Sequence, residues 1–295
     1  LLDLACGKGA DIPKWRDNGI STCVGIDIVT DNILNPIDGA CERYNYYKKN
    51  PRKDKKLPEI YFLKGDVSKN INTGDAFTDV RFKDYYRDLW NISDLETNFA
   101  ENKFDIVSIM FAIHYFFESK EKLDQLIENI DDNMKKGGFF IGTCFNGETI
   151  FNLLQNPQVN NILQEHKGGQ IIWKIKKKYT KSKFPKSADS LGMSIDVLIF
   201  SINKIIPEFL VNFDYLIERL EERGINLLSE KEMTDMDLPI VGKQKNSIGS
   251  FRDVFHKIEK ETTSSEMYHN IVKDLSEEEK KFSFLFNYFI FKKKS

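Results

Sequence analysis

A short apolar run that ends in two closely spaced glycines constrains the fold of this chain more than any other feature. The opening LLDLACGKGAD predicts a strand over Leu1–Ala5 and a helix from about Asp11. Gly7 and Gly9 at this junction let the backbone approach a ligand closely, and the helix start offers free N–H groups. A dinucleotide fingerprint would need a third glycine where Ile12 stands. The pattern therefore predicts a ligand site and argues against NAD.

The first 150 residues alternate short apolar runs with helical patterns, which is typical of a mostly parallel sheet with crossover helices. We therefore expect an α/β, Rossmann-like fold with helices on both faces of the sheet. The expected strands after the first are Ser21–Ile28, Glu59–Leu63, Phe104–Ala112 and Gly138–Cys144. The expected helices are Asp31–Lys49 and Ser119–Lys135, and the charged segment Asn50–Lys56 is expected to be a solvated loop.

The pattern changes after residue 150. Two β segments, Gln170–Tyr179 and Met193–Asn203, flank the basic loop Thr180–Gly192, which is either a solvated connector or an edge that contacts RNA. We expect a helix over Pro207–Arg223, a short helix over Asp274–Lys281 and a closing strand over Phe282–Phe291. Because no repeat or low-complexity linker is present, we expect one domain over 1–295. It is divided into a core (1–146), an inserted elaboration (147–206) and C-terminal helices with the closing strand (207–295).

Composition limits what the chain can bind. It carries 43 Lys and Arg residues against 45 Asp and Glu residues, a formal net charge of −2, so no broad basic field coats nucleic acid. Any nucleic-acid partner must be gripped locally. The longest apolar run, Ile106–Phe117, is interrupted by Ser108 and His114 and is shorter than the roughly 20 residues that a membrane span needs. We therefore expect no membrane partner.

Cysteine usage and the first residue bear on where the protein acts. The four cysteines, Cys6, Cys23, Cys41 and Cys144, are scattered and lack a CxxC pair. They are expected to be reduced thiols in an intracellular compartment, and no metal site is expected. Because Leu1 already lies inside an apolar run, we expect the sequence to be a fragment of a longer chain.

Two aspartates follow the ends of the next predicted strands. Asp27 is placed to accept the ribose hydroxyls of a nucleoside, and Asp66 to accept the exocyclic amine of adenine. Either residue alone would be read as a loop or cap residue. In this order, after a glycine turn, they predict an adenosine-containing ligand, and the set resembles that of class I S-adenosylmethionine methyltransferases.

A second group of residues points to a base acceptor. His114 and Tyr115 end the fourth predicted strand within SIMFAIHYFFES, where a histidine packed among core aromatics is the simpler alternative. Glu208, in IIPEFLVNF, is expected at a helix start, where it could merely complement the helix dipole. Its carboxylate could instead accept both N1–H and the 2-amino group of guanine, which adenine does not offer.

With these features, the chain resembles the mRNA cap guanine-N7 methyltransferases. The resemblance is carried by CGKG at 6–9, KW at 14–15, FxxHYxFES at 111–119, GGxFIGT at 137–143 and PEFLV at 207–211. The closing SFLFNYFIFKK at 283–293 is similar to the methyltransferase portion of mRNA capping enzymes from large DNA viruses.

The resemblance implies a class I S-adenosylmethionine methyltransferase fold with a cap-binding insertion. It implies that S-adenosyl-L-methionine is the cofactor, held by Ala5, Gly7, Gly9, Asp27, Asp66, Val67, Met110 and Tyr115. It implies that the cap contacts Lys8, Lys14, Arg43, Phe111, His114, Tyr115, Glu208, Phe286 and Tyr288. Met110 stands where the family commonly has glutamine. The family's C-terminal aromatic falls on Phe286, and Tyr288 on the same strand face could replace it.

The implied reaction is methyl transfer from S-adenosylmethionine to N7 of the guanine cap of mRNA. Since N7 carries a free lone pair, no general base is needed, and His114, Tyr115 and Glu208 would act by positioning. Two alternatives stay open: a class I methyltransferase for another nucleobase or a small molecule, and a degenerate subunit that binds RNA or a partner without catalysis.

The resemblance also implies partners and a location. The expected partner is 5′-capped mRNA, with guanylyltransferase and triphosphatase domains upstream in the same chain or a stimulatory subunit as further expectations. The expected location is intracellular and reducing: a viral factory, the host cytoplasm or the virion for a viral protein, and otherwise the nucleus.

Overall fold

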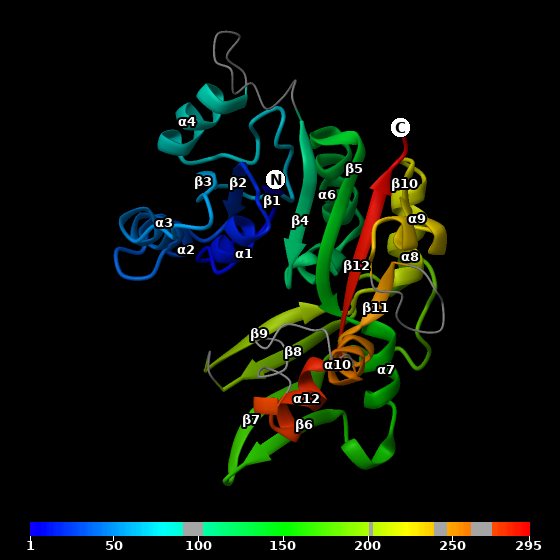
Figure 1. Ribbon diagram of the computed structural model, residues 1–295. Coiled ribbons are helices and arrows are strands. Elements are labelled where there is room, and N and C mark those ends of the chain that lie inside the picture. Colours follow the sequence, from blue (N-terminus) through cyan, green and yellow to red (C-terminus); the bar gives the residue numbers. More distant parts are fainter. Residues whose placement is uncertain (91–102, 201–202, 239–246, 261–272) are drawn as a thin grey trace.

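The computed structural model describes residues 1–90, 103–200, 203–238, 247–260 and 273–295 (Figure 1). A large mixed sheet forms the upper part of the molecule in this view, and a smaller sheet lies below it. Within the described residues, no helix combines the length and the apolar character that crossing a membrane would require.

The large sheet contains eight described strands. In chain order they are β1 (Leu2–Asp3), β2 (Thr22–Asp27), β3 (Glu59–Lys64), β4 (Phe104–Met110), β5 (Met134–Phe145), β10 (Ile225–Leu227), β11 (Ile248–Ser250) and β12 (Phe286–Lys293). The spatial order is β10-β12-β5-β4-β1-β2-β3, with β11 also paired to β12. The run from β5 to β3 is parallel, whereas β12 is antiparallel to β5, β10 and β11. The predicted mostly parallel sheet is therefore confirmed.

Helices cover this sheet and connect its strands. They are α1 (Ile12–Asp17), α2 (Thr30–Leu34), α3 (Ala40–Lys49), α4 (Val80–Trp90), α6 (Lys120–Asn133), α8 (Phe213–Glu221) and α9 (Glu230–Asp235), together with the 3₁₀ helix η1 (Ile113–Glu118). Val107, Ser108 and Ile109 are consecutive in β4 and all buried. Since successive strand residues face opposite sides, both faces of the sheet centre are covered.

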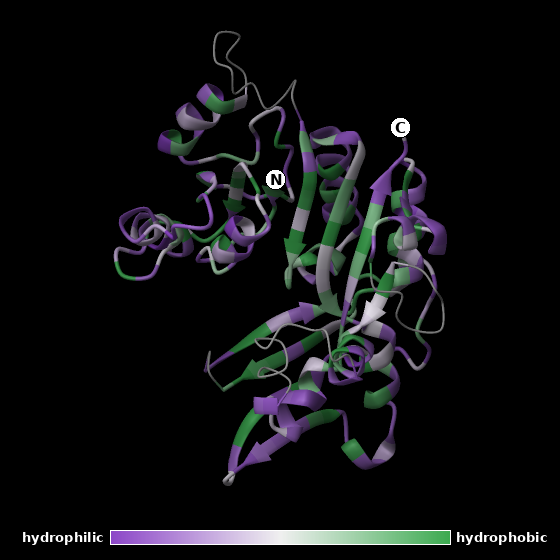
Figure 2. Ribbon diagram, in the orientation of Figure 1, coloured by the Kyte–Doolittle hydropathy of each residue, from purple (hydrophilic) through white to green (hydrophobic). Residues whose placement is uncertain are grey.

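The smaller sheet is antiparallel, in the order β6 (Ile162–Lys167), β7 (Gln170–Lys177), β8 (Ser194–Ile199) and β9 (Lys204–Phe209). Its strand β6 contacts α7 (Gly147–Leu154) and α12 (Glu277–Ser283), and α10 (Phe251–Lys260) packs against α12. The 3₁₀ helices η2 (Pro157–Val159) and η3 (Ala188–Ser190) lie in the connections of this sheet. Its own core includes Phe151, Trp173 and Ile195, and Phe145 at the end of β5 joins that core. Hydrophobic residues run along β4, β8 and β9 in Figure 2.

Two predicted helices are wrong in their extent. The expected helix Asp31–Lys49 is two helices, because Asn35 precedes a proline and turns to an extended ψ of 124°. The expected helix Pro207–Arg223 is a strand followed by a helix: Pro207 and Glu208 belong to β9, and α8 begins only at Phe213. Glu208 therefore does not start a helix. Proline is tolerated there because β9 is an edge strand.

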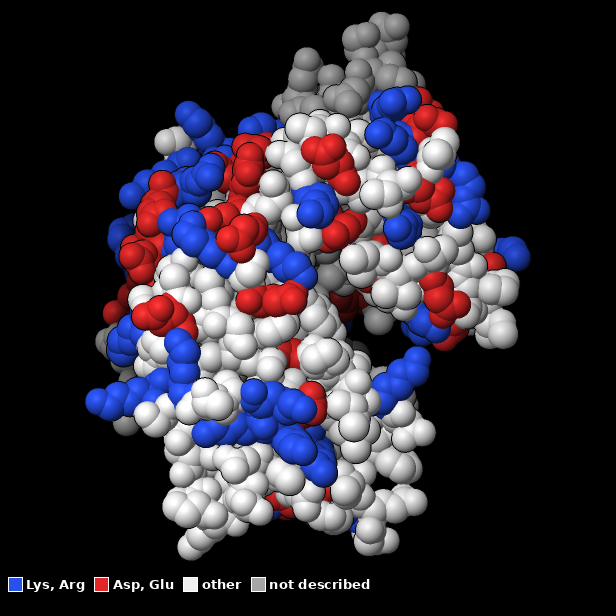
Figure 3. Space-filling view, turned by 180° about the vertical axis from the view of Figure 1, so that it is seen from behind, with Lys and Arg blue, Asp and Glu red and all other residues white. Residues whose placement is uncertain are grey.

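Other boundaries differ less. The first strand is limited to Leu2–Asp3, the fifth extends back to Met134, and the closing strand begins at Phe286 because α12 occupies the residues before it. The four cysteines are free, as expected. Positive and negative side chains are interspersed over the upper part of the face in Figure 3, and the lower part is mostly uncharged apart from one basic cluster.

Candidate active site

A cavity of about 590 Å³ lies where the parallel strands β1 to β4 end. This edge of an open α/β sheet is where such folds bind ligands. Of the residues predicted to hold the donor, six line it: Ala5, Asp27, Asp66, Val67, Met110 and Tyr115. Asn32, Ser68 and Lys122 also line it, and sequence analysis did not single them out.

Asp27 at the end of β2 is fixed by three hydrogen bonds. Its Oδ2 accepts from the Gly7 N–H at 2.9 Å, and its Oδ1 accepts from the Val29 N–H at 2.8 Å and the Asn32 amide at 3.0 Å. An ionised carboxylate has about four acceptor positions. One position is therefore open to a hydroxyl donor, and a second hydroxyl would replace the Asn32 amide.

Asp66 presents one oxygen to the cavity without competition. Its Oδ1 accepts from the backbone N–H and the hydroxyl of Ser68, at 3.0 and 2.7 Å. Its Oδ2 has no hydrogen-bond partner in the described part of the chain. An amine donor such as that of adenine can therefore be accepted there. Together with Asp27 and the cavity volume, this arrangement fits the nucleoside of S-adenosylmethionine.

The backbone turn at Gly7 and Gly9, called the glycine turn, supports residues that line this cavity. Gly7 and Gly9 have φ of +53° and +69°, a region that favours glycine. A Cβ on Gly9 would lie 3.0 Å from Ile12 Cδ1 and 3.3 Å from Ala40 at the start of α3. Neither glycine lines the cavity itself, so the structure assigns them to holding Asp27 and α3 in place.

A second cavity, of about 450 Å³, lies between the large sheet and the smaller one. Its wall is mostly apolar: Phe111, Tyr115, Phe145, Val197, Ile199, Ile206, Phe251, Phe282 and Phe286. His114, Glu208 and Ser283 supply the polar side chains. Phe111 and Tyr115 line both cavities, so the two spaces share a wall. Such a wall can hold two ligands face to face.

Phe111 carries unusual backbone strain in that wall. Its φ is +55°, which is rare for a bulky residue. Its N–H donates to the Thr143 carbonyl at 2.9 Å, and its ring meets the edge of Phe286 with centroids 5.2 Å apart. Strained residues held in this way concentrate at functional sites.

His114 in η1 and Glu208 in β9 meet in the second cavity. Since η1 packs against β9, the His114 Nε2 lies 3.6 Å from the Glu208 Oε2. Both residues are buried, at 4% and 8% exposure, and neither atom has a hydrogen-bond partner within the described residues. Burial lowers the pKa of His114 to about 3 and raises the pKa of Glu208 to about 8. The cavity therefore contains the Glu208 carboxyl group, which has an oxygen without a hydrogen-bond partner in the described part of the chain and is surrounded by aromatic side chains.

The two C-terminal aromatics occupy different places. Phe286 lines the second cavity and stacks on Phe145 with centroids 4.1 Å apart. Tyr288 does not line it, and its hydroxyl is buried without a partner in the described part of the chain. Burial raises the pKa of Tyr288 to about 12. Phe286 is therefore the one of the two that a ligand in this cavity would touch.

The basic residues predicted to contact a cap do not line either cavity. Lys8 Nζ binds the Asp38 carboxylate at 2.7 and 2.8 Å, and the Arg43 Nε donates to the Asp38 carbonyl at 3.1 Å. Lys8 and Arg43 are therefore brought together by Asp38. Lys14 is exposed and pairs with Asp11 at 2.6 Å.

Some contributors to the site carried no local signal in the sequence. Val197 and Ile199 share one face of β8, and Ile206 and Glu208 share one face of β9. Reading Lys204–Phe209 as a strand would have found this alternation. Within the described part of the chain, no group of three or more His, Cys, Asp or Glu side chains is placed to hold a metal ion.

The sequence is similar to known proteins over nearly its whole length. The sequence model of the mRNA (guanine-N(7))-methyltransferase domain matches residues 1–294. A probable mRNA-capping enzyme of Acanthamoeba polyphaga mimivirus is 28% identical over 236 residues, 77% of this chain and 19% of that protein. An mRNA cap guanine-N(7) methyltransferase of Candida albicans is 30% identical over 245 residues, 80% of this chain and 47% of that protein.

The chain spans less than half the length of these two relatives. Among solved structures, an S-adenosylmethionine-dependent methyltransferase from Clostridium acetobutylicum matches with a TM-score of 0.48 and 12% identity, covering 100% of this chain and 83% of that one.

Proposed function

Because this chain belongs to the mRNA (guanine-N7)-methyltransferase family, we propose that it transfers a methyl group from S-adenosylmethionine to N7 of the guanine cap of mRNA. The observation that carries the proposal is the pair of cavities with a common wall at Phe111 and Tyr115. One presents carboxylates suited to a nucleoside, and the other presents a buried acceptor inside a ring of aromatic side chains.

Guanine fits the second cavity by its chemistry. Its N1–H and 2-amino group are adjacent donors, and the Glu208 carboxylate can accept both. A buried acceptor without a partner is costly, so a ligand that supplies donors is strongly preferred over one that does not. Phe286 and the other rings would stack on the purine, at about 1–3 kcal/mol per stacked base.

Transfer would proceed by positioning. S-adenosylmethionine supplies an electrophilic methyl group on a sulfonium sulfur. Asp27 and Asp66 would hold the nucleoside, while Phe111 and Tyr115 border the point where donor and acceptor meet. N7 attacks with its own lone pair, so the protein removes no proton before transfer. Well-oriented reactions of this kind gain roughly 7–11 kcal/mol from proximity alone.

Glu208 also suits the product. Methylation at N7 places a positive charge on the guanine ring, and a carboxylate at its Watson–Crick edge offsets that charge in a site sheltered from water. His114 would hold the neighbouring Tyr115 ring, whose centroid lies 4.1 Å from its own. These are positioning roles, with no covalent enzyme intermediate.

The substrate implies partners. We propose that 5′-capped mRNA is the partner, and that the cap is made by guanylyltransferase and triphosphatase activities carried upstream in the same polypeptide or on another one. A stimulatory subunit stays a prediction. The reaction is proposed to be intracellular, in a viral factory, the host cytoplasm or the virion for a viral protein, and otherwise in the nucleus.

The deciding experiment compares methyl transfer to GpppA-capped RNA, uncapped RNA and GTP, with the product identified by nuclease digestion. We expect N7-methylguanosine from the capped RNA and none from the uncapped RNA. Methylation of the uncapped RNA, or at another position, would favour a methyltransferase for another base. Calorimetry with S-adenosylmethionine tests the degenerate-subunit alternative, which requires that the donor does not bind.

A further inference from the structure

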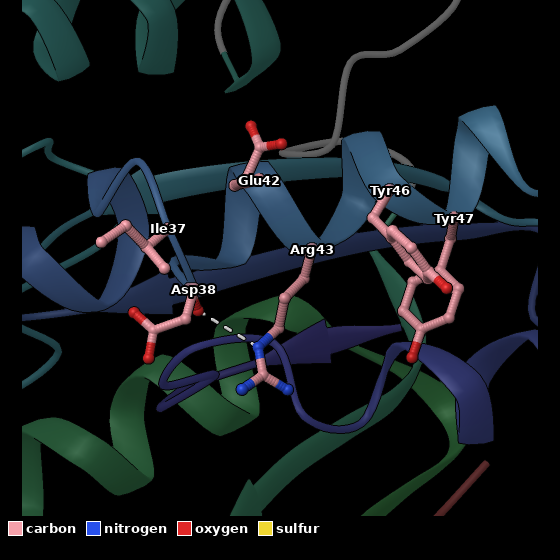
Figure 4. Close-up of a pocket in the computed structure, with 6 residues that line it drawn as sticks. All are labelled: Ile37, Asp38, Glu42, Arg43, Tyr46 and Tyr47. Carbon is pink, nitrogen blue, oxygen red and sulfur yellow. Dashed lines mark hydrogen bonds between the residues drawn. The ribbon is translucent and has the colours of Figure 1, made fainter.

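A third cavity, of about 340 Å³, lies on the surface of α3 and is not used by the methyl-transfer site (Figure 4). Ile37, Asp38, Glu42, Arg43, Tyr46 and Tyr47 line it. We call it the α3 pocket. Its volume is at the lower end of the range for ligand pockets, about 300–1,000 Å³, and suits a single nucleotide rather than a larger molecule.

The α3 pocket exposes an aromatic ring that is held in place. Tyr46 is 60% exposed, and its ring meets the ring of Tyr47 at a centroid distance of 5.6 Å and an angle of 75°. The guanidinium of Arg16 lies 5.6 Å from the centroid of Tyr47. Tyr47 is therefore fixed from behind, and Tyr46 presents an open face on which a base can stack.

A guanidinium with free N–H groups lines the same pocket. Arg43 uses its Nε for the Asp38 carbonyl, and its two terminal nitrogens have no partner among the described residues. The Asp38 carboxylate is occupied by Lys8, and Figure 4 shows the Glu42 carboxylate on the opposite side of the helix from the Arg43 guanidinium. The guanidinium is thus free to bind a phosphate.

An ion pair between Lys8 and Asp38 connects the wall of the α3 pocket with the glycine turn. Lys8 follows Gly7 in the glycine turn, next to the donor cavity, and its ammonium group reaches Asp38 in the pocket wall. A phosphate chain that reaches Lys8 would therefore lie close to Arg43, because both side chains bond to Asp38.

The positive charge continues past the pocket. Lys49 ends α3, and Lys53 and Lys56 follow in the exposed loop after it. In the part of the chain that the structure describes, none of the three forms an ion pair. Arg52 in the same loop is different, because it pairs with Asp54 at 2.6 Å and with Asp17 at 3.5 Å. Three exposed lysines without an ion pair thus follow Arg43 along the chain.

We propose that the α3 pocket and these three lysines bind the single-stranded RNA that follows the cap. This inference rests on the proposed function. A base beyond the first transcribed nucleotide stacks on Tyr46, its phosphate lies at Arg43, and later phosphates lie along Lys49, Lys53 and Lys56. An aromatic platform followed by free cations matches a strand of alternating bases and phosphates, and it accepts any sequence because every base has a π face. Because the protein is nearly neutral overall, its contacts with RNA must be local. The α3 pocket and the three lysines would provide these local contacts.

The test compares two substrates that share the cap: the dinucleotide GpppA and a GpppA-capped single-stranded RNA of about 20 nucleotides, longer than one such binding site. The variants are Tyr46→Ala and the triple variant Lys49→Gln, Lys53→Gln, Lys56→Gln. The matched controls are Tyr46→Phe, which keeps the ring, and a triple glutamine variant at the exposed residues Lys83, Lys136 and Lys294.

For both test variants we expect KM for the capped RNA to rise about tenfold, because stacking or phosphate contacts beyond the cap are lost. KM and kcat for GpppA should stay within about twofold of those of the unmodified protein. The triple lysine variant should also lower the salt-dependence slope of RNA binding by about 2, three contacts at roughly 0.7 each. Both controls should behave as the unmodified protein does.

Equal losses on GpppA and capped RNA would overturn the inference, because the α3 pocket would then serve the cap or the fold. An unchanged KM for capped RNA would overturn it as well. If the unmodified protein methylates neither substrate, the proposed function fails instead. In that case anisotropy measurements with labelled RNA still decide whether Tyr46 and the lysines bind it.

Discussion

The Nε2 of His114 lies 3.6 Å from the Oε2 of Glu208, and both atoms are buried without a hydrogen-bond partner among the described residues. This separation is too long for a hydrogen bond. Because burial moves the pKa of His114 to about 3 and that of Glu208 to about 8, the pair is neutral at pH 7 and not an ion pair. Glu208 is therefore a protonated acid in the free protein, and we expect it to ionise when a ligand donates hydrogen bonds to it.

Cap binding should strengthen as pH rises toward 8. Glu208 must be ionised to accept both guanine donors, and in the free protein it holds a proton below a pKa of about 8. Each pH unit below that value should weaken cap affinity by up to about tenfold, and binding should release a proton. Calorimetry in two buffers of different ionisation enthalpy measures both effects.

Glu208→Gln is the control for this prediction. It should bind the cap weakly at every pH and leave the affinity for S-adenosylmethionine within about twofold, because a hydrogen bond to a charged group contributes about 1.5–3 kcal/mol and two are lost. Donor affinity that fell as far as cap affinity would contradict the assigned role of Glu208.

Glu208→Gln should also stabilise the fold at alkaline pH. The pKa of Glu208 rises from 4.5 to about 8 on folding, so this residue costs the unmodified protein stability as pH rises from 4.5 to about 8, whereas His114 contributes in the opposite direction below pH 6.5. The loss is up to about 1.4 kcal/mol per pH unit, an upper bound of several kcal/mol. Thermal melts should therefore show a higher Tm for the variant at pH 8 and a similar Tm at pH 4.5. A lower Tm at pH 8 would mean that a neighbour compensates the charge.

His114→Ala should reduce turnover on capped RNA by about 10-fold or more while the protein stays folded. The His114 ring contacts Tyr115 and faces Glu208, so its loss frees two groups that position the purine, and small misplacements cost large factors in rate. Circular dichroism and donor binding check the fold, and His114→Gln provides a variant that fills more of the space. Full activity in both variants would make His114 a core residue only.

Most of the large sheet could be predicted from the sequence because its strands are continuous apolar runs bounded by turn residues. The Pro207 region could not. Ile205–Phe213 combines a proline with a long apolar stretch, which suits a helix start as well as an edge strand, and only pairing with β8 decides between them. The role expected of Glu208 depends on its carboxyl group and not on the element that carries it. Glu208 therefore lies in the site although the predicted helix is wrong.

The aromatic wall of the second cavity could not be predicted as a set. Phe145, Phe251 and Phe282 come from β5, α10 and α12, and a phenylalanine in each of these elements reads as ordinary core. These side chains form one cavity wall only where the large sheet and the smaller sheet come together. The donor residues differ, because Asp27 and Asp66 follow strands whose carboxyl ends share one sheet edge.

Asp27→Asn should weaken S-adenosylmethionine binding by about 10-fold or more and also lower stability. The carboxylate accepts from Gly7, Val29 and Asn32, and an amide turns one acceptor into a donor that faces these N–H groups. A stability loss of about 1–3 kcal/mol is expected from the unsatisfied donor. Calorimetry at a temperature where the variant is fully folded separates the two effects, and unchanged donor affinity there would remove Asp27 from the donor site.

Gly9→Ala should destabilise the protein more than Gly19→Ala, although both glycines have a φ of +69°. An added Cβ at Gly19 meets no atom within 4 Å, whereas at Gly9 it lies 3.0 Å from Ile12 Cδ1 and 3.3 Å from Ala40. The backbone strain, about 1–3 kcal/mol, is common to both variants, so the difference in their free energies of unfolding isolates the packing of the glycine turn against α3. Because that turn also donates to Asp27, only Gly9→Ala should weaken donor binding. Equal losses of stability would show that α3 moves away freely and that close packing at Gly9 does not hold the site together.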